Sequence, residues 1–111
     1  MENSELVDLG DALRSWCQTK ENKFNSQIYF KALEGYNIEN KISYDESIVM
    51  SSVGLITLEL AIRFLTDYFE ESYFQWDNKK YSSSAEHNYT RTLKTLNYYQ
   101  NISREFVKMK I

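Results

Sequence analysis

The sequence contains no proline, only one cysteine and only one histidine in 111 residues. The single cysteine, Cys17, cannot form a disulfide within the chain, and the single histidine, His87, excludes a Cys/His zinc site. A lone thiol is typical of the reducing cytoplasm, where we expect this protein to reside. Because nothing places His87 beside Cys17 as a base, we interpret Cys17 as a buried structural thiol. His87 is interpreted as part of a helix start rather than as a general base.

Glycine is also scarce, and the three glycines, at positions 10, 35 and 54, are isolated. They cannot form a glycine-rich phosphate-binding loop. No basic leader is visible in residues 1 to 11, and Glu59, Arg63 and Asp67 interrupt the best candidate for a membrane span. The net charge of −3 disfavours a broad phosphate-binding surface. Neither a nucleic acid nor a membrane is therefore an expected partner.

Apolar and aromatic residues at helical spacing dominate the rest of the chain. Hydrophobic residues make up 42% and aromatic residues 15% of the sequence, and a chain of this length can bury about two-thirds of its unfolded surface. Their recurrence at steps of three and four residues predicts helices throughout. We therefore expect an all-α fold of about five helices in a single domain, residues 1–111.

Capping residues predict where the helices of the first half begin. The first helix is expected from Asp8, as its cap, to about Gln18. Ser26 is the expected cap of the second helix, which ends near Gly35 and is followed by a loop over 37–42. A capping box formed by Ser43 and Glu46 is expected to start the third.

The second half contains a long apolar segment, an irregular connection and a final helix. Ser51, Ser52 and Gly54 weaken the segment from 44 to 71, so two helices are favoured there over one. The connection over 72–84 is expected to be irregular, with Tyr73, Phe74 and Trp76 packed back onto the body. The last helix runs from about Ala85 to Lys108, with an apolar face made of Tyr89, Leu93, Leu96, Ile102 and Phe106.

The stretch from Leu58 to Tyr68 is apolar around most of a helix and polar along one narrow seam. At 100° per residue, the polar side chains fall within an arc of roughly 100°; they are Ser52, Glu59, Arg63, Thr66, Asp67 and Glu70. A helix of this kind is expected to be surrounded by the rest of the protein.

Three further motifs carry a family resemblance when they are taken with this stretch. They are Asp8-Leu9-Gly10-Asp11-Ala12-Leu13-Arg14, Tyr73-Phe74, and Glu86-His87-Asn88 with Arg91. Together they resemble the C-terminal helical part of the phosphotransferase enzyme family, the small-molecule kinases with the aminoglycoside phosphotransferase fold. The members most similar in pattern are of the N-acetylhexosamine 1-kinase type.

In that family, a strand-rich ATP-binding lobe comes first, followed by an H-x-D-x-x-x-x-N catalytic loop, a metal-binding Ile-Asp-x-Asp segment and a D-F-G-D-A-x-R stretch. This chain opens at the last of these, with Leu9 in place of phenylalanine, and it lacks the proline usual before Glu86-His87-Asn88. The resemblance implies the C-terminal helical subdomain of a sugar or N-acetylhexosamine phosphotransferase, as a fragment or truncated reading frame that is inactive alone. ATP and magnesium are implied for the complete enzyme, whereas this chain is expected to hold no cofactor or metal and no catalytic residue.

The resemblance also suggests roles for particular residues. It implies that Asp8 holds the catalytic-loop backbone in place, although a capped helix start by itself explains Asp8 and Asp11 fully. It places the central helix on the acceptor side of the kinase cleft, which makes Arg63 our first choice and Asp67 our second for substrate binding. The alternative for Glu59, Arg63 and Asp67 is an ordinary exposed ladder of charges.

A different class of function also fits these features. The chain can be a small cytoplasmic helical module that binds another protein through its apolar helices. Under either interpretation, apolar helix faces are expected to be exposed, and they favour self-association or contact with the missing kinase lobe.

The missing catalytic groups lead to a first prediction, that the isolated chain neither binds magnesium-ATP nor transfers phosphate to N-acetylhexosamines, aminoglycosides or other small alcohols. Phosphoryl transfer needs a group that orients the acceptor hydroxyl, carboxylates that hold magnesium and donors that cradle the phosphates. Titration calorimetry with magnesium-ATP checks the binding, and a coupled kinase assay checks the transfer. Stoichiometric heat of binding, or turnover that persists through purification to homogeneity, would contradict the prediction.

Overall fold

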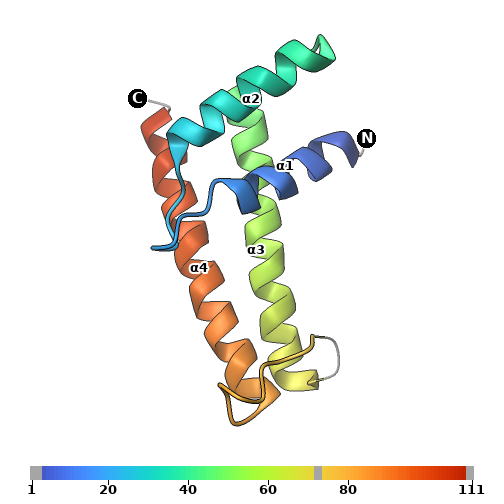
Figure 1. Ribbon diagram of the computed structural model, residues 1–111, viewed down its shortest axis with the longest axis vertical. Coiled ribbons are helices and arrows are strands. Elements are labelled where there is room, and N and C mark those ends of the chain that lie inside the picture. Colours follow the sequence, from blue (N-terminus) through green and yellow to red (C-terminus); the bar gives the residue numbers. More distant parts are fainter. Residues whose placement is uncertain (1–3, 72–73, 110–111) are drawn as a thin grey trace.

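The computed structural model describes residues 4–71 and 74–109, which form four α-helices. Figure 1 shows them in chain order as α1 (Ser4–Trp16), α2 (Ser26–Asn40), α3 (Glu46–Glu70) and α4 (Ser84–Met109). No strand occurs in these residues, where the only strand-like pairing is an isolated bridge between Gln18 and Phe24. The all-α prediction is therefore confirmed, but four helices are described rather than the expected five or so.

The difference in number arises because α3 is one continuous helix of 25 residues. Two of the residues that were expected to weaken this helix, Ser52 and Gly54, pack against other helices. Ser52 donates a hydrogen bond from its hydroxyl to the Leu6 carbonyl of α1 at 3.1 Å. Gly54 is buried, with side-chain atoms of Tyr99 and Ile102 on α4 within 3.9 Å of where its Cβ would lie. Packing therefore outweighs the roughly 1 kcal/mol that a glycine costs in a helix interior.

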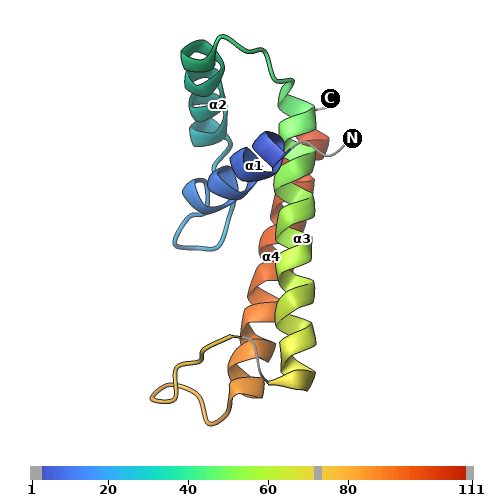
Figure 2. The ribbon, with the colours of Figure 1, turned by 90° about the vertical axis from the view of Figure 1, so that its right-hand side faces the viewer.

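A long antiparallel hairpin of α3 and α4 forms the body of the molecule, and the two helices lie side by side over most of their length (Figures 1 and 2). Figure 2 shows α1, α2 and the 74–83 connection on the same side of this hairpin. The other side of α3 and α4 is covered by no helix of the described residues. This one-sided arrangement gives the hairpin two different surfaces.

The crossing of α1 over α3 depends on Gly10. A Cβ atom at this position would lie 2.5 Å from Ser52 Oγ and 2.8 Å from Ile56 Cδ1, closer than van der Waals contact allows. Glycine therefore lets the two helices approach closely at their crossing point. The same contact fixes which residues of α1 face which residues of α3.

The start of α3 differs from the predicted capping box. The cap is Asp45, whose carboxylate accepts hydrogen bonds from the backbone N–H groups of Ser47 at 2.8 Å and Ile48 at 3.2 Å. Ser43 lies in the preceding loop and is exposed. Asp45 takes the capping role because it immediately precedes the first helical residue and reaches two free N–H groups at once.

The starts of α1 and α2 also differ from their predictions. Asp8 lies inside α1, one turn after its first residue, so it is not the cap. The cap of α2 is Asn25, whose side chain accepts a hydrogen bond from the Ile28 N–H at 3.1 Å. Ser26 instead donates its hydroxyl to Glu105 of α4 and so lowers the pKa of that carboxyl group. α2 also continues past Gly35 to Asn40, through most of the predicted loop.

The hydrophobic core lies where α1, α2 and the upper parts of α3 and α4 meet. Two of its tyrosines are almost completely buried, and each donates its hydroxyl to a backbone carbonyl. Tyr29 bonds to the Glu46 oxygen at 2.5 Å and Tyr98 to the Arg14 oxygen at 2.6 Å. The largest other members of the core are Leu9, Leu13, Phe24, Leu33, Val49, Met50, Val53 and Ile102.

Cys17 belongs to this core and is fully buried. Burial raises the pKa of its thiol to about 11, so the reactive thiolate is disfavoured at neutral pH. The prediction of a buried structural thiol is confirmed.

The interior of the hairpin becomes polar away from α1. From Thr57 onwards on α3, and before Leu93 on α4, the buried side chains are the apolar Ala61 and five polar ones, Thr57, Asp67, Ser84, Asn88 and Thr92. The predicted apolar face of α4 is therefore wrong in its first half, because Tyr89 is 54% and Leu93 46% exposed, although Ile102 is buried as expected. The polar stripe of this half faces inwards and the apolar stripe faces out.

One helix of the described residues, α3, is long and apolar enough by length and composition to cross a membrane. Its charged residues Glu59, Arg63 and Asp67 were expected to interrupt such a span. A helix in the core of a soluble protein passes the same test, so this finding has little weight alone.

The corrected cap leads to a prediction about stability. Asp45→Ala should lower the free energy of unfolding by about 1 kcal/mol, because two N–H groups at the start of α3 lose their acceptor. Ser43→Ala, two residues earlier, is the matched control and should change it by less than about 0.5 kcal/mol. Urea denaturation followed by circular dichroism measures both. A larger loss of unfolding free energy for Ser43→Ala than for Asp45→Ala would show that Ser43 is the cap, as the capping box predicted.

Candidate functional site

A small cleft between α1 and α3 brings together the two charged motifs of the sequence. Its volume is about 220 Å³. Residues of the first helix and of the central helix line it, among them Val7, Asp8 and Asp11 from α1 and Ile56, Glu59 and Arg63 from α3. The Gly10 crossing positions these side chains, since it joins the two helices within one turn of Asp8 and Asp11. Residues about fifty positions apart in the sequence thus share one cavity.

The charges of this cleft are paired within each helix rather than across it. Arg14 contacts Asp11 at 3.0 Å, and Arg63 contacts Glu59 at 3.3 Å. The side chain of Arg63 is 56% exposed and that of Glu59 67%, so solvent weakens their attraction to a few tenths of a kcal/mol. Arg63 can therefore leave Glu59 and turn towards a ligand at little cost. Within the described part of the chain, the Asp8 carboxylate accepts no hydrogen bond.

Asp67 occupies a different environment from Glu59 and Arg63. It is only 1% exposed, so the prediction that all three lie along one exposed seam is wrong for this residue. Its Oδ2 accepts hydrogen bonds from Asn88 Nδ2 and from the Phe74 N–H, each at 3.0 Å. The carboxylate thereby joins α3 to α4 and to the connection between them. Its role in substrate binding stays a prediction, with a structural role now assigned to its side chain.

Arg91 secures the connection to the end of the hairpin. Its guanidinium donates to the Gln75 carbonyl at 2.6 Å and to Asn88 Oδ1 at 3.1 Å. It also lies 5.4 Å from the ring centre of Phe64 and 5.9 Å from that of Phe74. The ring centres of Phe64 and Phe74 are 4.7 Å apart, which confirms the expected packing of Phe74.

The other two aromatic residues expected to pack here have different outcomes. Trp76 is 37% exposed, so it packs only in part. Tyr73 lies outside the described residues.

His87 lies in the first turn of α4, as expected for part of a helix start. Its ring stacks on Tyr81 at a centroid distance of 4.1 Å. Burial, together with the charge of Arg91, lowers its pKa and favours the neutral imidazole. Its two nitrogens each lie 3.1 Å from a donor, Asp77 N and Arg91 Nε. A neutral ring has one acceptor nitrogen, so it accepts from only one of the two at a time.

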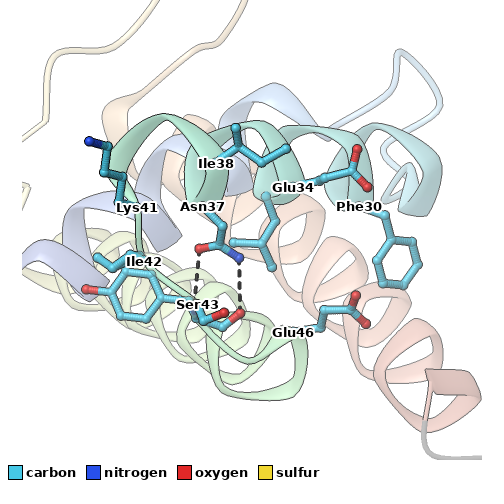
Figure 3. Close-up of a pocket in the computed structure, with 10 residues that line it drawn as sticks. Phe30, Glu34, Asn37, Ile38, Lys41, Ile42, Ser43 and Glu46 are labelled. Carbon is cyan, nitrogen blue, oxygen red and sulfur yellow. Dashed lines mark hydrogen bonds between the residues drawn. The ribbon is translucent and has the colours of Figure 1, made fainter.

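A larger cavity lies elsewhere, between the end of α2 and the start of α3, with a volume of about 480 Å³. Figure 3 shows Asn37 at its centre, bonded to the backbone of Tyr44 through Oδ1 at 3.1 Å and Nδ2 at 3.2 Å. Glu34 and Glu46 lie on one side of Asn37 and Lys41 on the other (Figure 3). Because the central amide is occupied in holding the loop, this cavity is a weaker candidate than the α1–α3 cleft.

Comparisons with family models, with curated proteins and with solved structures find no match for this chain. The resemblance to the phosphotransferase family therefore stays a prediction.

Sequence reasoning from composition missed the buried network of Asp67, Asn88 and Arg91. Polar residues at helical spacing look alike whether they face solvent or a partner helix, so periodicity alone did not place them inside. The available signal was the family motif Glu86-His87-Asn88 with Arg91, which marked the right segment without indicating what it contacts.

The buried carboxylate leads to a prediction about stability. Asp67→Ala should lower the free energy of unfolding by about 2–3 kcal/mol, because it leaves the Asn88 amide and the Phe74 N–H without their acceptor. Glu59→Ala, two turns earlier on the same helix, is the control and should cost less than about 0.5 kcal/mol. Chemical denaturation of both variants measures the difference. Equal small losses would show that the Asp67 network contributes nothing to folding.

Proposed function

We propose that this chain is the acceptor-side helical part of a small-molecule phosphotransferase with a kinase-like fold, and that it does not transfer phosphate alone. The observation that carries the proposal is the shared α1–α3 cleft. The family resemblance assigns Asp8 to the catalytic loop and Arg63 to the acceptor, and these roles require the two residues to face a common space. Asp8 and Arg63 line the same cavity.

Arg63 is the residue proposed to bind the acceptor. A guanidinium offers five N–H donors in a fixed plane, which suits the hydroxyl and amide oxygens of a sugar or N-acetylhexosamine. Its present partner, Glu59, is exposed and accepts hydrogen bonds, so it can bind a sugar hydroxyl beside Arg63. Asp67 is proposed to support this surface from behind, by fixing the lower end of α3.

In this proposal, magnesium-ATP is bound by the part of the enzyme that carries the catalytic loop and the nucleotide lobe. No group of three histidine, cysteine, aspartate or glutamate side chains gathers within the described residues in a position to hold a metal ion. The described glycines also form no phosphate-binding loop. The family resemblance implies that this part precedes the D-F-G-D-A-x-R stretch.

A second candidate function is a helical module that binds another protein. The observation that favours it is the set of apolar side chains that α3 and α4 expose on the side away from α1. The nucleotide sequence upstream of Met1 separates the two functions. An H-x-D loop and nucleotide lobe encoded there, in frame or across a disruption, support the phosphotransferase, whereas an unrelated region favours the binding module.

The acceptor site leads to a prediction about kinetics. In an intact family member that carries the segment from α1 to α3 of this chain, Arg63→Ala should raise KM for the sugar about tenfold or more. Loss of a hydrogen bond to a charged group costs about 1.5–3 kcal/mol. Steady-state kinetics measure this change, and thermal unfolding should show a nearly unchanged melting temperature.

Thr66→Ala is the control for this experiment. Thr66 is exposed on α3, three residues after Arg63, and it does not line the cleft. It should leave KM unchanged within about twofold. Equal small changes in KM for the two substitutions would mean that Arg63 only lies on the solvent-exposed side of the helix. The assignment of an acceptor site would then be abandoned.

A further inference from the structure

The side of the hairpin away from α1 carries an apolar seam on each helix. On α3 the seam consists of Ile48, Leu55, Leu58, Ile62, Leu65 and Phe69, with Ser51 completing the series. Successive members follow steps of three and four residues in alternation. Four of the six, Ile48, Leu55, Ile62 and Phe69, are more than half exposed. A helix surface that repeats every seven residues in this way fits the packing of a neighbouring parallel or antiparallel helix.

The seam on α4 has the same period. Its apolar members are Tyr89, Leu93, Leu96 and Val107, and Gln100 and Ser103 fill the two remaining steps. The two seams adjoin on one surface, which we call the uncharged face. At one end Leu55 and Val107 line a common groove of about 410 Å³. At the other end, Tyr68 links the two seams, because its ring centre lies 5.0 Å from that of Phe69 and 6.1 Å from that of Tyr89.

Charge is segregated away from this surface. Within the described helices α3 and α4, no seam position carries a charged side chain, although 26% of the residues in the chain are charged. The charged residues of α3 lie elsewhere, as Glu59 and Arg63 do in the cleft with α1. Two uncharged faces can therefore meet without like-charge repulsion and without desolvating an ion.

We propose that a second copy of this chain covers the uncharged face, so that two α3–α4 hairpins pack across a two-fold axis as a four-helix bundle. A self-complementary surface is what a two-fold dimer requires, and here each copy presents two seams with the same seven-residue period. Packing of seams with a seven-residue repeat gives the shallow crossing angle of four-helix bundles.

The size of the face is sufficient for a stable dimer. The 25 residues of α3 span about 37 Å, and two adjacent helices are about 20 Å wide, which gives a footprint of about 700 Å² on each protomer. A stable interface of standard size buries about 800 Å² of accessible surface per partner. Because accessible surface exceeds a flat footprint, the face reaches this size.

A lipid bilayer fits the same face less well. Helices that lie in a membrane surface are typically rich in lysine and arginine along their polar side. The exposed charged residues of α3 are mostly acidic, namely Glu46, Glu59 and Glu70 with the single arginine Arg63, α4 carries charges of both signs, and the whole chain has a net charge of −3. These charges oppose contact with an anionic membrane.

Sedimentation equilibrium of the full chain over a range of concentrations tests this proposal. The wild-type chain should be a dimer at micromolar concentrations. Ile62→Glu on α3 and Leu93→Glu on α4 each place a carboxylate in the middle of the interface, and each should raise the dimer dissociation constant about a hundredfold or more. Both residues are about half exposed in the single chain, so circular dichroism should show an unchanged fold.

Ile38→Glu is the matched control. Ile38 is an isoleucine on α2 that is 71% exposed and lies away from the uncharged face, so this variant should dimerise as the wild type does.

Three results would overturn the proposal. They are a wild-type chain that stays monomeric at high concentration, a dimer that resists both substitutions, and a monomer that pellets with vesicles of phosphatidylcholine and phosphatidylglycerol. The last result would assign the face to a bilayer. Dimerisation does not depend on the acceptor role of Arg63, so the proposed function and this interface can fail independently.

Discussion

The hairpin of α3 and α4 depends on a carboxylate that is buried between its two helices. Asp67 is 1% exposed and holds both Asn88 of α4 and the backbone of Phe74. Isolated buried carboxylates are costly, so hydrogen bonds must satisfy this one. Because polar side chains fill this end of the interior, the apolar side chains of the same helices face outwards. The uncharged face is thus a consequence of how the hairpin is closed.

The side of α3 that faces α1 is charged, unlike the uncharged face. There Gly10 allows α1 to cross closely, and the crossing brings the charges of Asp8 and Asp11 beside those of Glu59 and Arg63. One helix therefore separates a charged cleft from an uncharged surface. The cleft suits a small polar ligand, whereas the uncharged surface suits another helix. The two proposals rest on these two different sides of α3.

The sequence predicted the helical class, the buried thiol and the regions of the four helices, because the apolar spacing and the lone cysteine are local signals. It misplaced the cap of α3 by two residues, since Ser43 and Asp45 are both good capping residues and only the backbone path decides between them. It also divided α3, because the contacts that support Ser52 and Gly54 come from distant residues of α1 and α4.

The most informative failure concerned which side of each helix faces inwards. α3 is apolar around most of its circumference, so its periodicity could not distinguish the covered side from the exposed side. For α4, the stripe with Tyr89 and Leu93 looked like a core face, yet Asn88 and Thr92 occupy the interior.

The central claim, that the exposed apolar stripes form one interface, is tested most directly by hydroxyl-radical footprinting of the chain at low and high concentration. Our account predicts that Leu55, Ile62 and Phe69 become protected as concentration rises while Trp16 and Ile38 remain equally reactive. Protection centred on Trp16, or unchanged reactivity along α3, would contradict it.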